Sequence, residues 1–304
     1  MWISADSEKI RYTGRIDWSV PKEPTWIFPC TSSEFKFTGN TLKIHVKNKN
    51  EYWQNYLGCI LDNVQSRFYI KKEGETKIEV RVNENETGVH HVLFFKRQDS
   101  CHEVTILGYE IEDGEKLLEL PKKTDKRIEV YGDSVSAGEV SEAVDFVGKE
   151  DPEHEGGYSN SYYSYGWVLA RKLGAQIHDI AQGGIALMDG EGWYHEPEQI
   201  GMETVWNKVH YNTRLSRMSE WDFSEYIPQV VIVAVGQNDC HPEDYMKEEY
   251  CHPQARKWRE HYMNFLRKLR SVYSEAYIIC CTTLLNHDES WDDAIAQVVK
   301  NMDD

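Results

Sequence analysis

The strongest constraint on the fold is a change of pattern near residue 121. Before it, the chain of 304 residues carries short segments rich in β-branched and aromatic residues, separated by turn residues. These expected strands are Phe35–Phe37, Thr41–Val46, Arg67–Ile70, Lys77–Val82, Val89–Phe95 and Val104–Ile111. Because no helical period of useful length lies between them, residues 1–122 are predicted to form an all-β, jelly-roll-like antiparallel sandwich.

The polar segment Pro121–Arg127 breaks this pattern, so we place the domain boundary there. Strands then alternate with helices. The expected strands are Ile128–Tyr131, Gln176–Ile180, Val230–Val235 and Ala276–Cys281, and the expected helices are Ser161–Leu173, Gln254–Tyr273 and Trp291–Met302. Continuous apolar strands such as Val230–Val235 suit a parallel sheet covered on both faces. Residues 127–304 are therefore predicted to form an α/β/α domain.

Composition excludes several classes of partner. The formal charge of −17 argues against nucleic acid or an anionic membrane surface, and no apolar run is long enough to span a membrane. The first residues, Met1–Asp6, lack the features of a signal peptide, so the chain as written is expected in the cytoplasm, or secreted if a signal has been removed. The odd number of cysteines, 7, favours free thiols in a reducing compartment.

Small and polar residues follow three of the expected strands. They read GDS at 132–134, AQGGIA at 181–186 and GQND at 236–239. Because the carboxyl ends of parallel strands meet at one edge of a sheet, a serine, a glycine backbone NH and an asparagine side chain are brought to one place. A nucleophile beside two or three donors is what acyl transfer from an ester requires.

Each of these loops also has a simpler explanation, which the sequence leaves open. The glycine pair at 183–184 could be only a turn, and Asn238 could cap the next helix. For Asp133 we favour turn stabilisation through backbone NH groups over a chemical role. Gly132 permits a tight turn, and a helix expected to begin near Ser136 would point its NH groups at the serine.

The three motifs resemble blocks I, II and III of the SGNH (GDSL-like) hydrolases, over residues 128–304. That resemblance implies Ser134 as the nucleophile. It also implies an oxyanion hole formed by the NH groups of Ser134 and Gly184 and the side chain of Asn238.

The β-rich first half extends the resemblance over the whole chain. With HVLFFKR at 91–97 and SYYSYGWVLA at 161–170, the chain is similar to carbohydrate esterase family 2. Members of that family remove acetyl groups from xylan, mannan and related saccharides. The resemblance thus implies an SGNH-hydrolase domain preceded by a jelly-roll-like domain.

The general base is the part of the resemblance that departs from the pattern. SGNH hydrolases take it from a histidine in a late D-x-x-H segment, which we expect after residue 304, because none follows the last expected strand. His241 and His287 are weak substitutes, and His252 precedes the long helix. The resemblance implies a Ser–His dyad whose imidazole is held by a backbone carbonyl, without an essential acid.

Sugar-binding residues are expected among the aromatic side chains, since flat rings stack on the CH faces of sugars. We expect Trp193, in a glycine-rich loop, and Trp291, beyond the fourth strand, to bind substrate; core packing explains most of the 10 tryptophans. No cofactor or metal is expected. His154, His178 and His195 do not have the spacing of metal ligands, although carboxylates accompany them.

Together these features predict a serine esterase that removes O-acetyl groups from plant polysaccharides or oligosaccharides of the xylan, mannan or glucan type, through an acetyl-serine intermediate. Two alternatives stay open: a lipase- or thioesterase-like SGNH hydrolase, and a non-catalytic carbohydrate-binding protein. The expected partner is an acetylated saccharide, and neither nucleic acid nor a membrane. Whether the protein forms a homo-oligomer is left open.

Overall fold

The computed structural model describes residues 1–83, 88–153, 155–194, 199–282 and 284–302. The chain divides into two compact units. The first contains Met1–Thr124 and Gly138–Trp167, and the second contains Asp125–Ala137 and Val168–Asp304. Among the described residues, no helix has the length and apolar character needed to cross a membrane.

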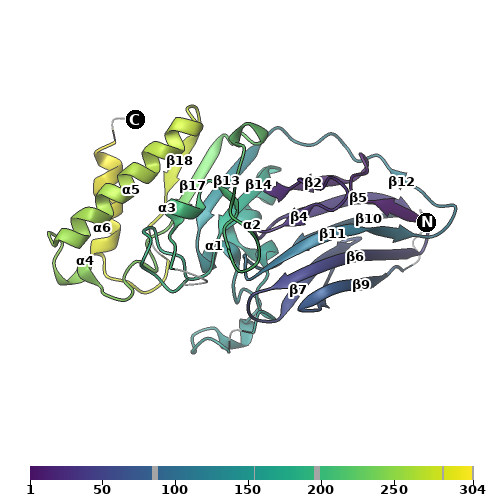
Figure 1. The fold of residues 1–304 in the computed structure, drawn as a ribbon, viewed down its shortest axis with the longest axis horizontal. Coiled ribbons are helices and arrows are strands. Elements are labelled where there is room, and N and C mark those ends of the chain that lie inside the picture. Colours follow the sequence, from purple (N-terminus) through teal and green to yellow (C-terminus); the bar gives the residue numbers. More distant parts are fainter. Residues whose placement is uncertain (84–87, 154, 195–198, 283, 303–304) are drawn as a thin grey trace. The chain divides into compact units, whose positions relative to one another are not determined.

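Two antiparallel sheets build the first unit (Figure 1). In the described residues, one sheet has the order β3-β4-β11-β6-β9 with β1 on β11, and the other has the order β12-β5-β10-β7-β8 with β2 on β5. The first sheet contains β1 (Trp2–Ser4), β3 (Ile16–Asp17), β4 (Thr25–Trp26), β6 (Thr41–Asn50), β9 (Glu73–Arg81) and β11 (His102–Ile111). The second contains β2 (Arg11–Thr13), β5 (Ser32–Thr38), β7 (Asn55–Leu61), β8 (Val64–Ile70), β10 (Val89–Lys96) and β12 (Leu117–Leu118). The expected antiparallel sandwich is confirmed.

The core of this unit follows from period-2 alternation. Along β6, Leu42, Ile44 and Val46 are buried, while Lys43 and Lys47 between and after them are more accessible. Apolar side chains from both sheets form one buried cluster, which includes these three residues and phenylalanines of β5 and β10. Burial of such a face against a second sheet is the main source of stability of a sandwich.

Strand β7 has no counterpart among the expected strands. A glycine inside a strand removes the side chain that marks the pattern, and Gly58 stands in the middle of β7. A Cβ on Gly58 would lie 2.1 Å from the ring of Phe95, which is fully buried. The glycine is therefore needed because an aromatic ring of β10 occupies the place of its side chain.

Residues 138–167 belong to the first unit, although the sequence pattern assigns them to the domain at 127–304. Ser161 anchors this segment, because its Oγ donates to the carbonyl of Lys96 (2.7 Å) and its N–H to that of Arg97 (3.0 Å). The ring of Phe95 also contacts the ring of Trp167, with centroids 5.3 Å apart. These long-range contacts leave no trace in local sequence periodicity.

A parallel sheet forms the centre of the second unit (Figure 1). Its order in the described residues is β14-β13-β17-β18, with a separate pair β15-β16. The strands are β13 (Arg127–Gly132), β14 (Gln176–Ala181), β17 (Val230–Ala234), β18 (Tyr277–Cys280), β15 (Lys208–His210) and β16 (Ser219–Glu220). The α-helices are α1 (Ser134–Ala137), α2 (Tyr165–Leu173), α3 (Met202–Val205), α4 (Tyr245–Glu248), α5 (Pro253–Val272) and α6 (Ser290–Lys300), of which α2 begins in the first unit. The expected parallel sheet is thus confirmed.

Helix α5 begins where local chemistry favours a start. Pro253 occupies the first turn, where its missing N–H costs nothing, and the ring of His252 accepts a hydrogen bond from Gln254 N (3.2 Å). His252 therefore caps a helix. The buried face of α5 includes Trp258, Tyr262 and Phe265, and Phe265 packs against Tyr131 of the sheet with ring centroids 5.8 Å apart.

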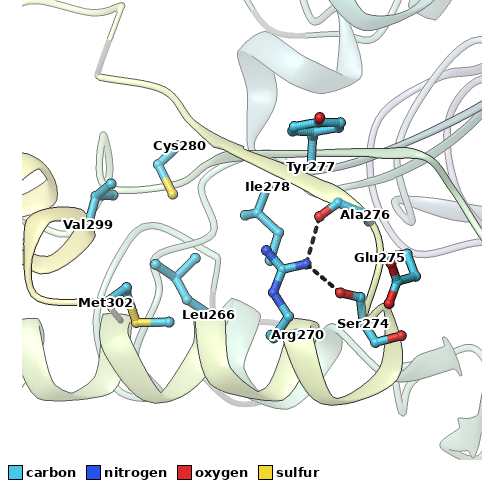
Figure 2. Close-up of a pocket in the computed structure, with 10 residues that line it drawn as sticks. All are labelled: Leu266, Arg270, Ser274, Glu275, Ala276, Tyr277, Ile278, Cys280, Val299 and Met302. Atoms are coloured by element: carbon cyan, nitrogen blue, oxygen red, sulfur yellow. Dashed lines mark hydrogen bonds between the residues drawn. The ribbon is translucent and has the colours of Figure 1, made fainter. Parts of the chain in front are cut away.

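A pocket of about 450 Å³ opens beside β18, lined by that strand, α5 and the end of α6 (Figure 2). Arg270 closes one side by donating to the carbonyls of Ser274 (3.2 Å) and Ala276 (2.6 Å), which ties the end of α5 to the start of β18. The lining of this pocket contains none of Ser134, Gly184 and Asn238. The pocket therefore belongs to β18, the last strand in the sheet order of the described residues, and not to the loops that carry these three residues.

Candidate active site

Three loops leave the parallel sheet from one row of paired residues. Gly132, the last residue of β13, pairs with Ala181 at the end of β14 and with Ala234 at the end of β17. The segments that carry Ser134, Gly184 and Asn238 therefore start side by side at the carboxyl edge of the sheet. This edge is where ligands bind in open α/β sheets.

The Ser134 turn is held by the carboxylate before it. Asp133 Oδ1 accepts a hydrogen bond from Val135 N (3.0 Å), and Asp133 is fully buried, in agreement with the expected turn-stabilising role. The turn is tight, because a Cβ on Gly132 would lie 1.9 Å from Ser136 Oγ. Ser134 itself is partly exposed, and its Oγ has no hydrogen-bond partner among the described residues.

The helix after the serine differs from the expected one. Helix α1 begins at Ser134 and not near Ser136, and it is a single turn of 4 residues. The backbone then turns at Gly138 (φ +75°) and Val140 (φ +46°), conformations that end a helix. One turn has only a small dipole. We therefore expect individual NH groups, and not the dipole of this helix, to act on a charge that develops beside Ser134.

Gly184 occupies a position that only glycine accepts. Its φ is +74°, and a Cβ there would lie 2.9 Å from the Cβ of Trp193 and 3.0 Å from the N of Tyr194. Its carbonyl accepts hydrogen bonds from both of those backbone NH groups, at 2.7 and 3.0 Å. Within the described residues the N–H of Gly184 has no acceptor, so it remains available as a donor.

Asn238 lies against the Gly184 loop. Its side chain is nearly buried, and its Nδ2 donates to the carbonyl of Ile185 at 3.0 Å. A carboxamide nitrogen carries two hydrogens, so this contact orients the group and leaves one donor for a ligand. Asn238 therefore does not act as a simple cap of the next helix in this structure.

The third loop is joined to the other two by its neighbouring side chains. Gln237 Nε2 donates to Asp133 Oδ2 at 2.7 Å, which connects the third loop to the serine turn. Asp239 Oδ1 accepts from Leu187 N (2.8 Å) and from Trp258 Nε1 (2.6 Å), which connects it to the second loop and to α5. Sequence reasoning missed both links, because it named the GQND motif only for Asn238.

Asp239 is fully buried, and no cation of the described residues acts on its carboxyl group. Its Oδ2 has no hydrogen-bond partner among the described residues, and burial raises the pKa of Asp239 to about 7, against the hydrogen bonds from Trp258 and Leu187, which lower it. The carboxylates of Glu191 and Asp133 raise it further. Asp239 is therefore protonated in the folded protein over a pH range in which an unfolded aspartate is charged.

This difference predicts a pH-dependent effect of Asp239→Asn. Below about pH 4 the carboxyl is protonated in both states and contributes nothing; as pH rises to about 7 only the unfolded state loses its proton, so stability falls. The neutral amide removes this loss. The free energy of unfolding of the variant, relative to the native protein, should rise by on the order of 2–4 kcal/mol between pH 4 and pH 8. Urea unfolding at the two pH values measures it, and a constant difference would contradict the assignment.

Trp193 lies exposed in the loop whose backbone bonds to Gly184. Its side chain is 60% exposed, and its ring stacks on that of His241, with centroids 3.5 Å apart and an interplanar angle of 18°. The carbonyl of His241 also accepts from Gly192 N (3.0 Å). An exposed, flat ring held by a stacked partner is suited to contact with a sugar face.

Trp291 does not have the expected role in binding substrate. Its side chain is 0% exposed, its Nε1 donates to Asp244 Oδ1 at 2.9 Å, and its ring meets that of Trp258 edge-on at 5.4 Å. It is a core residue that packs α6 onto α5. A tryptophan on the buried face of a helix looks the same in sequence as one at a cleft, which explains the error.

His287 is held at both ring nitrogens. Nδ1 lies 2.5 Å from the carbonyl of Leu285, and Nε2 lies 3.0 Å from Asp292 Oδ2. Partial burial lowers the pKa of His287, but the Leu285 carbonyl and the Asp292 carboxylate outweigh it and raise the pKa. Both ring nitrogens thus face acceptors, and the raised pKa favours the imidazolium, which has no lone pair with which to accept the serine proton.

The histidines considered as metal ligands do not form a metal site where they are described. His178 stacks on Tyr226, with ring centroids 3.5 Å apart, while His154 and His195 lie outside the described residues. No group of three or more His, Cys, Asp or Glu side chains suited to a metal occurs in the part of the chain that the structure describes.

A further residue that sequence reasoning missed is Glu191, in the loop of Trp193. Its carboxylate accepts from Tyr245 OH (2.8 Å) and from Gln254 Nε2 (2.7 Å), and it is nearly buried. These bonds tie the Trp193 loop to α4 and α5. No local signal distinguishes such an acid from a surface glutamate, because its partners are more than 50 residues away.

Comparison with known proteins relates both units to esterases. Residues 12–121 match the family model for the N-terminal domain of carbohydrate esterase 2. The chain is 30% identical over 277 residues to the cellulase/esterase CelE of Acetivibrio thermocellus, which covers 91% of this chain and 31% of that protein. The chain thus spans less than a third of the length of CelE. It is 25% identical over 288 residues, 94% of this chain and 75% of the relative, to an acetylxylan esterase / glucomannan deacetylase of Cellvibrio japonicus.

The same relationship appears among solved structures. A family two carbohydrate esterase from Clostridium thermocellum, in complex with cellohexaose, matches with a TM-score of 0.78 and 28% identity, over 96% of this chain and 84% of that one. The chain therefore carries the fold of a carbohydrate esterase. The resemblance to carbohydrate esterase family 2 that the sequence predicted is confirmed.

Proposed function

We propose that this protein is a serine esterase with an SGNH-type site, which removes O-acetyl groups from plant polysaccharides or oligosaccharides. The observation that carries the proposal is the common origin of the loops of Ser134, Gly184 and Asn238 at one edge of the sheet, with Asn238 bonded to the Gly184 loop. The activities in the names of the two relatives, esterase and acetylxylan esterase, support it.

The proposed reaction uses Ser134 Oγ as the nucleophile. The oxygen attacks the acetyl carbonyl carbon while a histidine takes its proton, and the N–H groups of Ser134 and Gly184 and the second N–H of Asn238 hold the oxyanion. The sugar oxygen then leaves with the proton from the imidazolium, and acetyl-Ser134 remains. Water repeats the attack and releases acetate.

The histidine that acts as general base is inferred from the family resemblance and not from the contacts of the described residues. His241, His252 and His287 are engaged with Trp193, Gln254 and Asp292 respectively, and none is hydrogen-bonded to Ser134 Oγ among the described residues. We therefore assign the general base to none of these three.

Trp193 is proposed to bind the sugar, and its replacement tests this. Trp193→Ala should raise KM for an acetylated oligosaccharide by about fivefold, since a lost stacking contact is worth on the order of 1 kcal/mol. Trp193→Phe, which keeps a flat ring, should fall between. Hydrolysis of p-nitrophenyl acetate, which has no sugar, should change less than about threefold in either variant. Equal losses on both substrates would contradict a sugar-binding role.

Acetate release from acetylated xylo-, manno- and gluco-oligosaccharides tests the function itself. A deacetylase should release acetate from one of these classes and should hydrolyse p-nitrophenyl acetate much faster than the hexanoate ester. A lipase- or thioesterase-like enzyme should prefer the longer acyl chain, which needs an apolar acyl pocket. Saccharide binding by isothermal titration without acetate release would favour the carbohydrate-binding alternative, and the bound cellohexaose of the Clostridium esterase makes that comparison necessary.

A further inference from the structure

The side chain of Gln237 joins two segments that are far apart in sequence. Its Nε2 donates to Asp133 Oδ2 (2.7 Å), directly before Ser134. Its Oε1 accepts from the backbone N of Leu284 (2.7 Å) and of Leu285 (2.9 Å), in the loop that follows β18. A single carboxamide therefore connects the serine turn to the loop that also holds His287.

The donors and acceptors on the two sides of Gln237 fit in one direction only. On one side a carboxylate can only accept, and on the other side two N–H groups can only donate. Turning the amide around would place its NH₂ against two N–H donors and its oxygen against Asp133. The other carboxylate oxygen, Asp133 Oδ1, is bonded to Val135 N and cannot relieve this mismatch. Because Asp133 is fully buried, a mismatched donor–acceptor pair at its carboxylate costs more than the bond itself contributes.

Resting on the proposed function, we propose that Gln237 is a positioning residue, which fixes Ser134 relative to the Gly184 and Asn238 donors through this one-directional chain of hydrogen bonds. Gln237 adjoins Asn238, and its partner Asp133 adjoins Ser134, so one side chain sets the relation of nucleophile to donor. A displacement of about 1 Å in such an arrangement can lower a rate by about 10².

The titratable groups around the Gln237–Asp133 contact bear on any test of the direction of this hydrogen bond. Asp133 is fully buried, and burial raises the pKa of Asp133 to about 6 against the hydrogen bonds from Gln237 and the backbone, which lower it. The carboxylates of Asp133 and Glu191 act on Asp239, which follows Gln237 by two residues. His287, which is bonded to Asp292, belongs to the same loop as Leu284 and Leu285. No cation from the described residues pairs with Asp133, so the amide of Gln237 is its side-chain donor.

Two substitutions reverse the hydrogen bond and provide the test. Asp133→Asn places an NH₂ against that of Gln237 while its Oδ1 still accepts from Val135 N, and kcat for p-nitrophenyl acetate should fall by at least about tenfold with KM little changed. Adding Gln237→Glu restores a matched pair, because the new amide at position 133 donates to the new carboxylate at position 237. The second oxygen of that carboxylate still accepts from Leu284 N and Leu285 N. The double variant has the charge of the native protein and should recover kcat to within about threefold.

The single variant Gln237→Glu adds a pH readout that a structural defect would not produce. Two facing carboxyl groups share one proton, so its kcat relative to the native protein should be nearly constant near pH 6 and fall at least about tenfold by pH 9, while the double variant shows no such fall. Thermal melts of all variants establish that they fold.

The two proposals fail in different ways. If Asp133→Asn keeps native kcat, or if the double variant is no better than Asp133→Asn, Gln237 does not position the nucleophile. If Gln237→Glu shows a pH-independent ratio to the native protein, the inference is equally overturned. If Ser134→Ala is as active as the native protein in the same assay, it is the proposed function that fails.

Discussion

Ser134→Ala is expected to reduce acetate release by at least about 10³-fold while leaving the fold intact. The hydroxyl is the proposed nucleophile, and losses of that order or greater follow removal of a serine from a nucleophile–histidine pair. Because Ser134 is partly exposed and its Oγ has no partner among the described residues, the substitution removes no buried hydrogen bond. The melting temperature should therefore change by less than about 2 °C.

A matched control separates the chemistry from general damage. Ser271 lies on the exposed side of α5, where its Oγ bonds the carbonyl of Lys268 (2.7 Å) in the same helix. Ser271→Ala should keep native kcat. Retention of native turnover by Ser134→Ala would refute the assignment of the nucleophile, whatever the behaviour of the control.

Asn238→Ala is expected to lower kcat by about 10²–10³, the cost of removing one oxyanion donor. The free N–H of the carboxamide is the proposed donor, and its bond to the Ile185 carbonyl fixes its direction. This donor stabilises the transition state more than it stabilises the bound substrate, so KM should change little. Steady-state kinetics with p-nitrophenyl acetate measure both quantities.

Two further variants make this result specific. Asn238→Asp keeps the shape of the side chain but replaces the NH₂ with an acceptor, so it should be at least as impaired as the alanine variant. Asn264→Ala, on the exposed side of α5, should behave as the native protein. A loss in Asn238→Ala that appears only in KM would show that Asn238 binds substrate and does not stabilise the oxyanion.

The parts of the fold that follow from short-range pattern were predictable from the sequence. Strand β6 alternates buried and accessible residues, and β17 is a continuous apolar run. Both strands can therefore be recognised from local sequence alone, without knowledge of the strands they pair with. The convergence of the three loops was predictable for a different reason. Parallel strands of similar length end at one edge, and the register of Gly132 with Ala181 and Ala234 meets that expectation.

What could not be predicted depends on contacts between distant residues. Gly58 interrupts the sequence pattern of β7, because the ring of Phe95 occupies the place of a side chain there. Trp291 is buried because it packs on Trp258. The links made by Gln237 and Asp239 depend on which side chain faces which across the loops. Such facts are set by tertiary packing, and neither composition nor spacing encodes them locally.

The most direct test of the proposed site is a crystal structure of the protein after reaction with a p-nitrophenyl phosphonate ester, which mimics the tetrahedral intermediate. We expect a covalent bond from Ser134 Oγ to phosphorus, with one phosphonyl oxygen about 2.7–3.1 Å from both Gly184 N and Asn238 Nδ2, as an oxyanion hole requires. An adduct on Ser134 whose oxygens all lie beyond hydrogen-bonding distance of those two donors, or no adduct on Ser134, would contradict it.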